Sequence, residues 1–380
     1  MLFDLTADQE FLRDTTARFL ADRVPTGTLR QLRDDPAGYD HEYWRRGAEL
    51  GWVSLLVDED HGGGSITDRP LVDASLLAFE FGRHAAPGPF LPCNVVAGAL
   101  GASPTVAGAG LLAGLLDGTA VAGWAYAEGH PAGHLPAALE LEIRIDGVEA
   151  VVHGTKRPVE SAAQAGHLLV TGRTGDGLTQ VLVPADAPGM SVVPMQSMDL
   201  TRRFAKVTFD QVRVPAAHVL GEPGGAGAQV ARQLRQALVL TCAESVGALQ
   251  TGFDLTTEWA FDRYSFGRPL ASYQALKHRF ADMKTWLEAS HAIADAAAVA
   301  VADDAPDADE LVSVAKAFVG DYGAELLHDC VQLHGGIGVT FEHDLHLYLR
   351  RVTLDRALLG TPADHRRLVT DILERREAAA

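Results

Sequence analysis

Two long helical patterns joined by a short corner constrain the fold of this chain most. Apolar residues recur at helical spacing through residues 228–262 and again through 272–303. Between them, Gly267 and Pro269 end a helix, because glycine adopts the left-handed exit and proline cannot continue a helix. We expect Ser272 to cap the second helix. At about 1.5 Å per residue the first helix is roughly 50 Å long, so a large helical layer is required.

The remaining segments predict three parts. Residues 1–118 have helical periodicity, with Thr6 as an expected N-cap. Residues 119–220 contain short alternating runs typical of strands, which predict a small β-barrel or sandwich. Residues 221–380 add helical segments near 308–333 and 363–377, which complete a four-helix bundle. The predicted fold class is therefore α+β multidomain, in the order helical, β, helical.

Two polar side chains stand at the corner between the long helices. The turn is expected to bring Arg263 and Gln274 close together, although they are eleven positions apart. A guanidinium offers a planar fork of donors that suits a phosphate-bearing ligand. The alternative interpretation is a corner salt bridge and a surface amide.

Charge and cysteine content exclude several classes of protein. The formal net charge of −18 argues against nucleic acid or an anionic membrane as a partner. Three scattered cysteines, without a C-x-x-C, indicate buried thiols in a reducing compartment. No charged-then-apolar leader and no membrane-spanning apolar run occur, so we expect a cytoplasmic location.

Two weaker patterns were weighed for chemistry. His61-Gly62-Gly63-Gly64 resembles a lipase oxyanion loop, but the chain has no G-x-S-x-G nucleophile elbow, so a glycine turn is favoured. His343 and His346 lie three residues apart beside acidic residues, but no third converging ligand is visible. A solvated helix face is favoured there, and we predict no metal site.

Four motifs occur in one order over nearly the whole chain. They are Val57-Asp58-Glu59-Asp60-His61-Gly62-Gly63, Gly154-Thr155-Lys156, the corner motif Arg-x-x-Phe-Gly-x-Pro-Leu from Arg263 with Gln274 and Ala281-Asp282-Met283, and Gln332-Leu333-His334-Gly335-Gly336-Ile337-Gly338 with Tyr348-Leu349-Arg350-Arg351. Together they resemble the acyl-CoA dehydrogenase family. The resemblance implies that family's helical, β and helical domains, FAD, an acyl-CoA thioester substrate, an oligomer, and electron-transfer flavoprotein as the electron acceptor.

The chain departs from the family where a catalytic base is expected. The resemblance implies a glutamate before a Gly-Thr near the C-terminus, and Leu359 stands there, before Gly360 and Thr361. Some members place the base on the long helix instead, at a position that Ala237 occupies here. Neither side chain can accept a proton.

Other departures concern the flavin and CoA. The resemblance implies a hydroxyl facing the flavin where Ala127 stands, and an aromatic residue then Ser or Thr where Pro158 and Glu160 stand. A carboxylate near a reduced flavin is expected to be electrostatically unfavourable. The arginine that contacts CoA aligns with Leu238, and Arg235 one turn earlier is a candidate replacement.

These departures predict a subunit that lacks the catalytic base and completes a partner's FAD site in a heteromer. The heteromer is expected to be a heterotetramer that carries out FAD-dependent α,β-dehydrogenation of an acyl-CoA thioester. The residues expected to bind the partner's FAD are Arg263, Ser265, Phe266, Gln274, Gln332, Gly335 and Gly336. One alternative is a self-sufficient homo-oligomeric acyl-CoA dehydrogenase whose base is Glu244 or Asp364. Another is a flavin-free scaffold or acyl-binding protein on the same fold.

Overall fold

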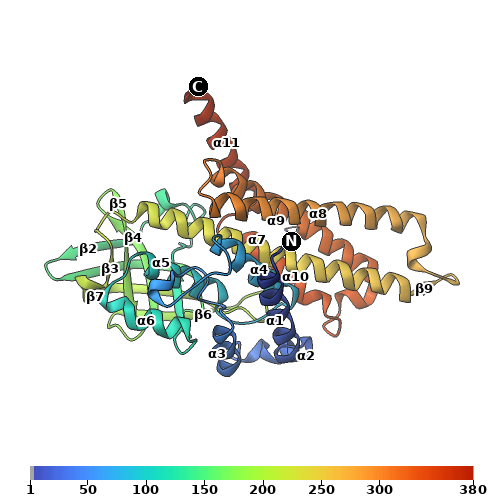
Figure 1. Ribbon diagram of the computed structural model, residues 1–380, viewed down its shortest axis with the longest axis horizontal. Coiled ribbons are helices and arrows are strands. Elements are labelled where there is room, and N and C mark those ends of the chain that lie inside the picture. The colour runs from blue at the N-terminus through green and yellow to red at the C-terminus, as the bar shows by residue number, and fades with distance from the viewer. Residues whose placement is uncertain (1–3, 380) are drawn as a thin grey trace.

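The chain folds as three consecutive parts, as its residue patterns predict. The computed structural model describes residues 4–379. Figure 1 shows the strands gathered at one end of the molecule together with α5 (Phe90–Ala102) and α6 (Val106–Leu116), the first N-terminal helices near its middle, and long helices that run to the opposite end. The family-like order of helical, β and helical parts is therefore confirmed.

The N-terminal part contains six helices. They are α1 (Ala7–Arg23), α2 (Thr26–Gln31), α3 (His41–Glu49), α4 (Pro70–Arg83), α5 (Phe90–Ala102) and α6 (Val106–Leu116). Thr6 caps α1 as predicted, because its hydroxyl accepts from the Gln9 amide while the Gln9 side chain accepts from the Thr6 amide. Trp44 and Trp52 are buried in this part and anchor its core.

Helix α4 crosses the long helix α7 (Gly227–Asp262) at very close range. A Cβ atom on Gly82 would lie 1.8 Å from the Glu244 carbonyl oxygen, and one on Gly247 would lie 1.9 Å from that of Phe79. Only glycine allows this approach at both positions. The crossing fixes the N-terminal helices against the helix that runs the length of the molecule (Figure 1).

The middle part is one eight-stranded sheet. Its strands are β1 (Ala122–Ala125), β2 (Glu142–Asp146), β3 (Glu149–Glu160), β4 (His167–Thr174), β5 (Gly177–Pro184), β6 (Met190–Met195), β7 (Phe204–Pro215) and β8 (Val219–Leu220). They follow the order β6-β7-β3-β2-β4-β5-β8, with β1 parallel to β4. Asp146 and Gly147 form the β2–β3 turn, and Gly147 has a φ of 63°.

The C-terminal part is a bundle of long helices joined by short connections. It consists of α7, α8 (Gln274–Ala302), α9 (Ala308–His334), α10 (Leu345–Ala357) and α11 (Pro362–Ala379), with a small hairpin of β9 (Tyr264–Ser265) and β10 (Arg268–Pro269) at the corner. Figure 1 shows α11 projecting from the body and the hairpin at the far end from the sheet. Within residues 4–379, no helix is long and apolar enough to cross a membrane.

The predicted Ser272 cap is wrong. Helix α8 begins at Gln274, after Tyr273, and no side chain caps it. The Ser272 hydroxyl donates instead to the Pro269 carbonyl oxygen at 2.7 Å, within the turn after β10. Local hydrogen bonding within the turn therefore uses the hydroxyl that the pattern assigned to the helix.

Candidate functional site

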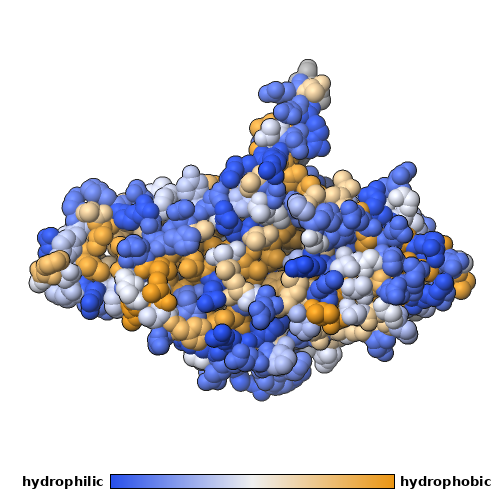
Figure 2. All heavy atoms as spheres, turned by 180° about the vertical axis from the view of Figure 1, so that it is seen from behind, coloured by the Kyte–Doolittle hydropathy of each residue, from blue (hydrophilic) through white to orange (hydrophobic). Residues whose placement is uncertain are grey.

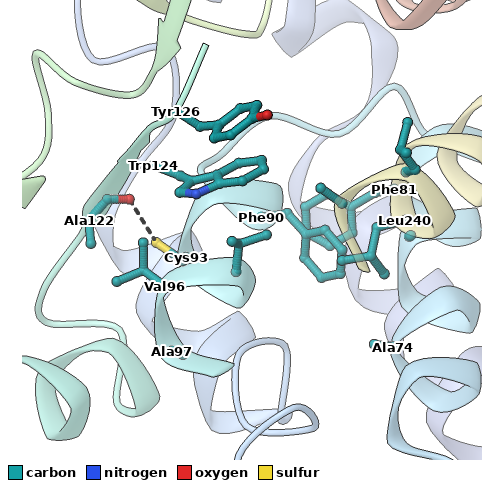
Figure 3. Close-up of a cluster of buried hydrophobic side chains, with 14 of the residues drawn as sticks. Ala74, Phe81, Phe90, Cys93, Val96, Ala97, Ala122, Trp124, Tyr126 and Leu240 are labelled. Atoms are coloured by element: carbon teal, nitrogen blue, oxygen red, sulfur yellow. Dashed lines mark hydrogen bonds between the residues drawn. The ribbon is translucent and has the colours of Figure 1, made fainter. Parts of the chain in front are cut away.

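A cavity of about 220 Å³ lies between the sheet, the start of α5 and the loop after α10. Its wall includes the two aromatic side chains Trp124 and Tyr126, which are two residues apart in and after β1. Their rings are stacked, with centroids 5.0 Å apart and an interplanar angle of 16° (Figure 3). The Tyr126 hydroxyl donates to the His134 carbonyl oxygen at 2.9 Å, which fixes this ring and therefore the wall.

Glu128 is the first of three carboxylates that line this cavity. It accepts from the buried Lys156 ammonium at 2.7 Å and from the backbone amides of Glu140 and Leu141 at 2.8 and 3.0 Å. Burial would raise the pKa of Glu128, but the Lys156 charge and the hydrogen bonds from Lys156 and the two backbone amides together hold that pKa below its usual value. Burial also lowers the pKa of Lys156 to about 8.

Glu160 is the second lining carboxylate, and it forms a two-pronged ion pair with Arg202. The two bonds, from Nε and Nη2 of the guanidinium, are 2.7 and 2.6 Å long. The guanidinium also donates to Asp355 at 2.6 Å, and burial raises the pKa of Asp355 to about 7. The Glu160 carboxylate is therefore paired with a buried arginine that it shares with Asp355 and Glu244.

Asp364 is the third lining carboxylate, and it forms a capping box with Thr361 at the start of α11. It accepts from the Thr361 amide at 2.9 Å and from the Thr361 hydroxyl at 2.6 Å, while the hydroxyl accepts from the Asp364 amide at 3.3 Å. The Thr361 hydroxyl holds the pKa of Asp364 below its usual value. This carboxylate therefore serves the start of the helix.

Leu359 lies in the cavity wall, on the loop between α10 and α11. Its φ is 57°, in the left-handed region that a leucine rarely adopts. The loop is tied down from behind, because the buried Lys316 ammonium donates to the carbonyl oxygens of Asp355, Arg356 and Gly360 at 2.8, 3.1 and 3.1 Å. The structure therefore places an apolar side chain at the cavity on a firmly held loop.

The second position where a base was expected, on the long helix α7, is not part of the wall of this cavity. Ala237 is fully buried in α7 and does not line this cavity. Glu244 lies farther along α7, where it forms ion pairs with Arg351 and, at 3.5 Å, with Arg202. Arg351 is fully buried and also pairs with Asp199. The Glu244 carboxylate is thus part of a buried ion-pair network between α7, α10 and the loop before β7.

The corner presents its site residues to solvent. Phe266 and Gly267 form the turn of the hairpin, with φ values of 49° and 79°. The Phe266 side chain is 97% exposed, although a bulky residue at positive φ is strained. Arg263 and Gln274 are also exposed, and no carboxylate among residues 4–379 lies within 4.0 Å of the Arg263 guanidinium.

An aromatic stack links the corner to the second glycine motif. The Arg263 guanidinium lies 5.9 Å from the Trp259 ring centre, and the Trp259 ring stacks on His334 with centroids 5.3 Å apart. Gly335 and Gly336 follow His334 directly, and a Cβ on either would meet nothing within 4 Å. Gln332 is exposed one turn before them.

Gln274 and Ser265 take other partners. The Gln274 amide contacts His278 at 3.3 Å, and the Ser265 carbonyl oxygen accepts from the Tyr273 hydroxyl at 2.7 Å. No hydrogen bond joins Arg263 to Gln274 within the described part of the chain. Exposed donors and an open glycine backbone nevertheless fit the phosphate-bearing part of FAD at this corner.

Two further groups could bind a ligand, Arg235 and a cluster around Glu128, but both already have partners within the chain. The Arg235 guanidinium pairs with Asp309 at 2.7 and 3.0 Å, so it is engaged on the bundle surface. The ligand atoms of Glu128, His130 and Glu140 lie within 4.8 Å of one another, a cluster that the sequence patterns missed. Because Lys156 already supplies a positive charge to Glu128, this cluster does not support a cation site.

Comparison with known proteins gives the class. The N-terminal domain model of acyl-CoA dehydrogenases matches residues 6–107, and the C-terminal domain model matches residues 225–373. Acyl-CoA dehydrogenase IpdE2 of Mycobacterium tuberculosis is 30% identical over 372 residues, which cover 97% of this chain and 98% of that protein. The chain therefore belongs to the acyl-CoA dehydrogenase family, whose members use FAD.

Solved structures agree with this assignment. A variant of the Tcur3481-Tcur3483 steroid acyl-CoA dehydrogenase superposes with a TM-score of 0.88 at 28% identity, covering 98% of this chain and 99% of that one. A chain of the ChsE4-ChsE5 complex from Mycobacterium tuberculosis superposes with a TM-score of 0.89 at 23% identity, covering 98% of this chain and 99% of that one. At this identity the similarity supports the fold alone. The names of both proteins join two components.

Proposed function

We propose that this chain is the base-lacking subunit of a heteromeric acyl-CoA dehydrogenase and completes a partner's FAD site. One observation carries the proposal: each carboxylate that lines the chain's own cavity is already engaged. Glu128 binds Lys156, Glu160 binds Arg202, and Asp364 forms a capping box at the start of α11. A base must be free to take the proton from the carbon next to the thioester, and Leu359 occupies the loop where it would stand.

The corner would act on the partner. Arg263 and Gln274 would hold the phosphate-bearing part of FAD, and the open backbone of Gly335 and Gly336 would let it approach. Phe266 would pack against the partner, which accounts for a strained and almost fully exposed aromatic residue. FAD, when bound, supplies the acceptor for the hydride that leaves the substrate.

A self-sufficient enzyme is less well supported. Its two candidate bases were Glu244 and Asp364, and both carboxylates have strong partners here. For Asp364 the Thr361 hydroxyl lowers the pKa, which reduces the tendency of that carboxylate to take a proton. The steroid acyl-CoA dehydrogenase among the similar structures favours the heteromer, with a bulky acyl thioester as substrate.

An absorption spectrum of the purified chain is the first test. We expect a colourless protein that reduces no dye with acyl-CoA thioesters, and a yellow, active complex after co-expression with a second acyl-CoA dehydrogenase subunit. Flavin bound by the chain alone, with turnover, would contradict the proposal. A chain that stays colourless with each candidate partner would favour the scaffold alternative.

Removing the Arg263 guanidinium is the sharper test. Arg263→Ala should leave the chain folded, because the residue is exposed at the end of a helix. Flavin retention by the complex should fall by roughly ten- to hundred-fold, since a hydrogen bond to a charged group contributes about 1.5–3 kcal/mol. The measurement is flavin per complex after gel filtration, beside circular dichroism.

Arg268 offers a matched control in the same hairpin. It is also exposed, and its guanidinium lies 3.9 Å from the Tyr273 ring centre. Arg268→Ala should keep its flavin. Equal flavin loss in both variants would indicate a disturbed hairpin, and full retention in Arg263→Ala would exclude the clamp.

A further inference from the structure

A second cavity, of about 430 Å³, lies where the three parts of the chain meet. Its walls come from the turn after α2, from the loop between β6 and β7, from Phe341 just before α10, and from Arg350 within α10. The lining residues that matter here are Arg33, Arg203, Phe341 and Arg350. None of them belongs to the cavity at Leu359 or to the corner.

Three arginines face this cavity without a carboxylate partner. No carboxylate among residues 4–379 lies within 4.0 Å of the guanidinium of Arg33, Arg203 or Arg350. Two carboxylates do line the cavity, but Asp199 is paired with the buried Arg351, and Asp34 is exposed. In a chain of net charge −18, such a surplus of positive charge is unusual.

The hydrogen bonds of Arg350 and Arg203 go to backbone carbonyl oxygens and not to carboxylates, while Asp199, Asp35 and Asp34 act on the Arg203 charge only from farther away. The Arg350 guanidinium donates to the Met198 carbonyl oxygen at 3.0 Å, while its buried Nε has no acceptor. Arg203 donates only to backbone carbonyl oxygens, such as that of Asp35 at 2.8 Å. Burial lowers the pKa of Arg203. Charges held this way are stabilised when a counter-ion enters.

One wall is aromatic. The Arg33 guanidinium lies 5.6 Å from the centre of the Phe341 ring, which is 38% exposed. An arginine fork beside a flat ring can receive a phosphate together with a planar group attached to it. The cavity volume is within the usual range of small-molecule sites, about 300–1,000 Å³.

We propose that this cavity, hereafter the arginine pocket, binds a phosphate-bearing small molecule. Its phosphate would lie between Arg33 and Arg350, with Arg203 supplying charge from behind. The phosphate can belong to a free inorganic anion or to a nucleotide whose ring packs near Phe341. The proposal does not depend on the role of Leu359 or of the corner.

Calorimetric titration of the full chain with pyrophosphate and with ADP tests the arginine pocket. Arg33→Gln and Arg350→Gln should each weaken binding by roughly ten- to hundred-fold, because each removes a charged donor worth about 1.5–3 kcal/mol. Arg33 is exposed, so its variant should fold even if the half-buried Arg350 variant does not. Arg232→Gln, an exposed arginine on α7 outside the pocket, should bind as the wild type does.

The outcomes separate the alternatives. Binding of both probes with similar affinity indicates that phosphate alone is recognised, and tighter ADP binding indicates the nucleotide. Binding that survives Arg263→Ala belongs to the arginine pocket, whereas binding lost only in Arg263→Ala belongs to the corner and overturns this proposal. It is also overturned if neither probe binds at millimolar concentration, or if Arg33→Gln and Arg350→Gln alter only the size of the assembly in gel filtration.

Discussion

At the scale of single residues, Leu359 combines an apolar side chain with a strained backbone. Its φ of 57° costs roughly 1–2 kcal/mol for a residue other than glycine. The neighbouring contacts hold it there, since the Leu359 carbonyl oxygen lies 3.0 Å from Nε2 of His365. The backbone of this loop therefore directs the side chain at position 359 toward the cavity, whether that side chain is apolar or charged.

We therefore expect Leu359→Glu to fold normally and still to give no acyl-CoA turnover by the chain alone. The new carboxylate would stand at the cavity, but Pro158 offers no aromatic face to a flavin, and the Glu160–Arg202 pair remains in the wall. Acyl-CoA turnover is measured by dye reduction with a panel of acyl-CoA thioesters, and Leu359→Gln is the uncharged control. Turnover by the glutamate variant would show that this cavity needs only a base.

The positions of Leu359 and of the corner residues could be located from the sequence, because short motifs carry them, while their roles stay predictions. The partners of Glu160 and Glu244 could not. Arg202 is 42 residues from each along the chain, and Asp355 is 153 residues from Arg202. No local pattern reports which buried arginine neutralises a distant carboxylate.

At the scale of elements, long periodic segments were predictable and α10 was not. The predicted helix at 308–333 appears as Ala308–His334, and that at 363–377 as Pro362–Ala379. Helix α10 buries Arg351 and Asp355 on the face that normally carries apolar side chains. Ion pairs at core positions hide the apolar period that indicates a helix.

The loop from α10 to α11 depends on the single ammonium of Lys316. Replacing it by Lys316→Met should lower stability at pH 7.5 by about 1–3 kcal/mol, because three carbonyl oxygens, two of them in buried contacts, lose their donor. The wild type should also change with pH. Burial lowers the pKa of Lys316 from 10.5 to about 8, so between these values the unfolded chain holds more protons.

Wild-type stability should therefore rise with pH through this window, by up to about 3 kcal/mol, and the variant should lack this contribution. The difference in apparent thermal midpoint between wild type and Lys316→Met should widen from pH 7.5 to pH 10. Lys284→Met, an exposed lysine paired with Glu288, is the control. A difference that stays constant with pH would contradict the buried titration.

At the scale of the whole molecule, exposed apolar side chains indicate a subunit contact. Figure 2 shows hydrophobic side chains gathered in the middle of one face, below the projecting α11. Toward the corner, Phe266, Val339 and Tyr264 are 97%, 76% and 62% exposed. Apolar groups that accumulate on a surface usually mark an interaction site.

Phe266→Ser and Val339→Ser should therefore weaken assembly by roughly five-fold or more each, at about 1 kcal/mol or more for a buried contact, without unfolding the chain. Light scattering after gel filtration measures the mass, and circular dichroism measures the fold. Val148→Ser is the control, since Val148 is 83% exposed in the β2–β3 turn at the opposite end. An unchanged mass in both test variants would place the contact elsewhere.

The order in which the ribosome synthesises the chain determines when the buried ion-pair network can form. Residues 160, 199 and 202 emerge early, whereas Arg351 and Asp355 emerge near the end of synthesis. Until then, Asp199 and Glu244 lack the arginine that neutralises both of them. A nascent chain halted before α10 would offer Glu244 only the longer 3.5 Å pairing with Arg202, and it would leave Asp199 without its ion-pair partner. The ion pairs of Asp199 and Glu244 with α10 therefore cannot form during translation until Arg351, residue 351 of 380, has been added.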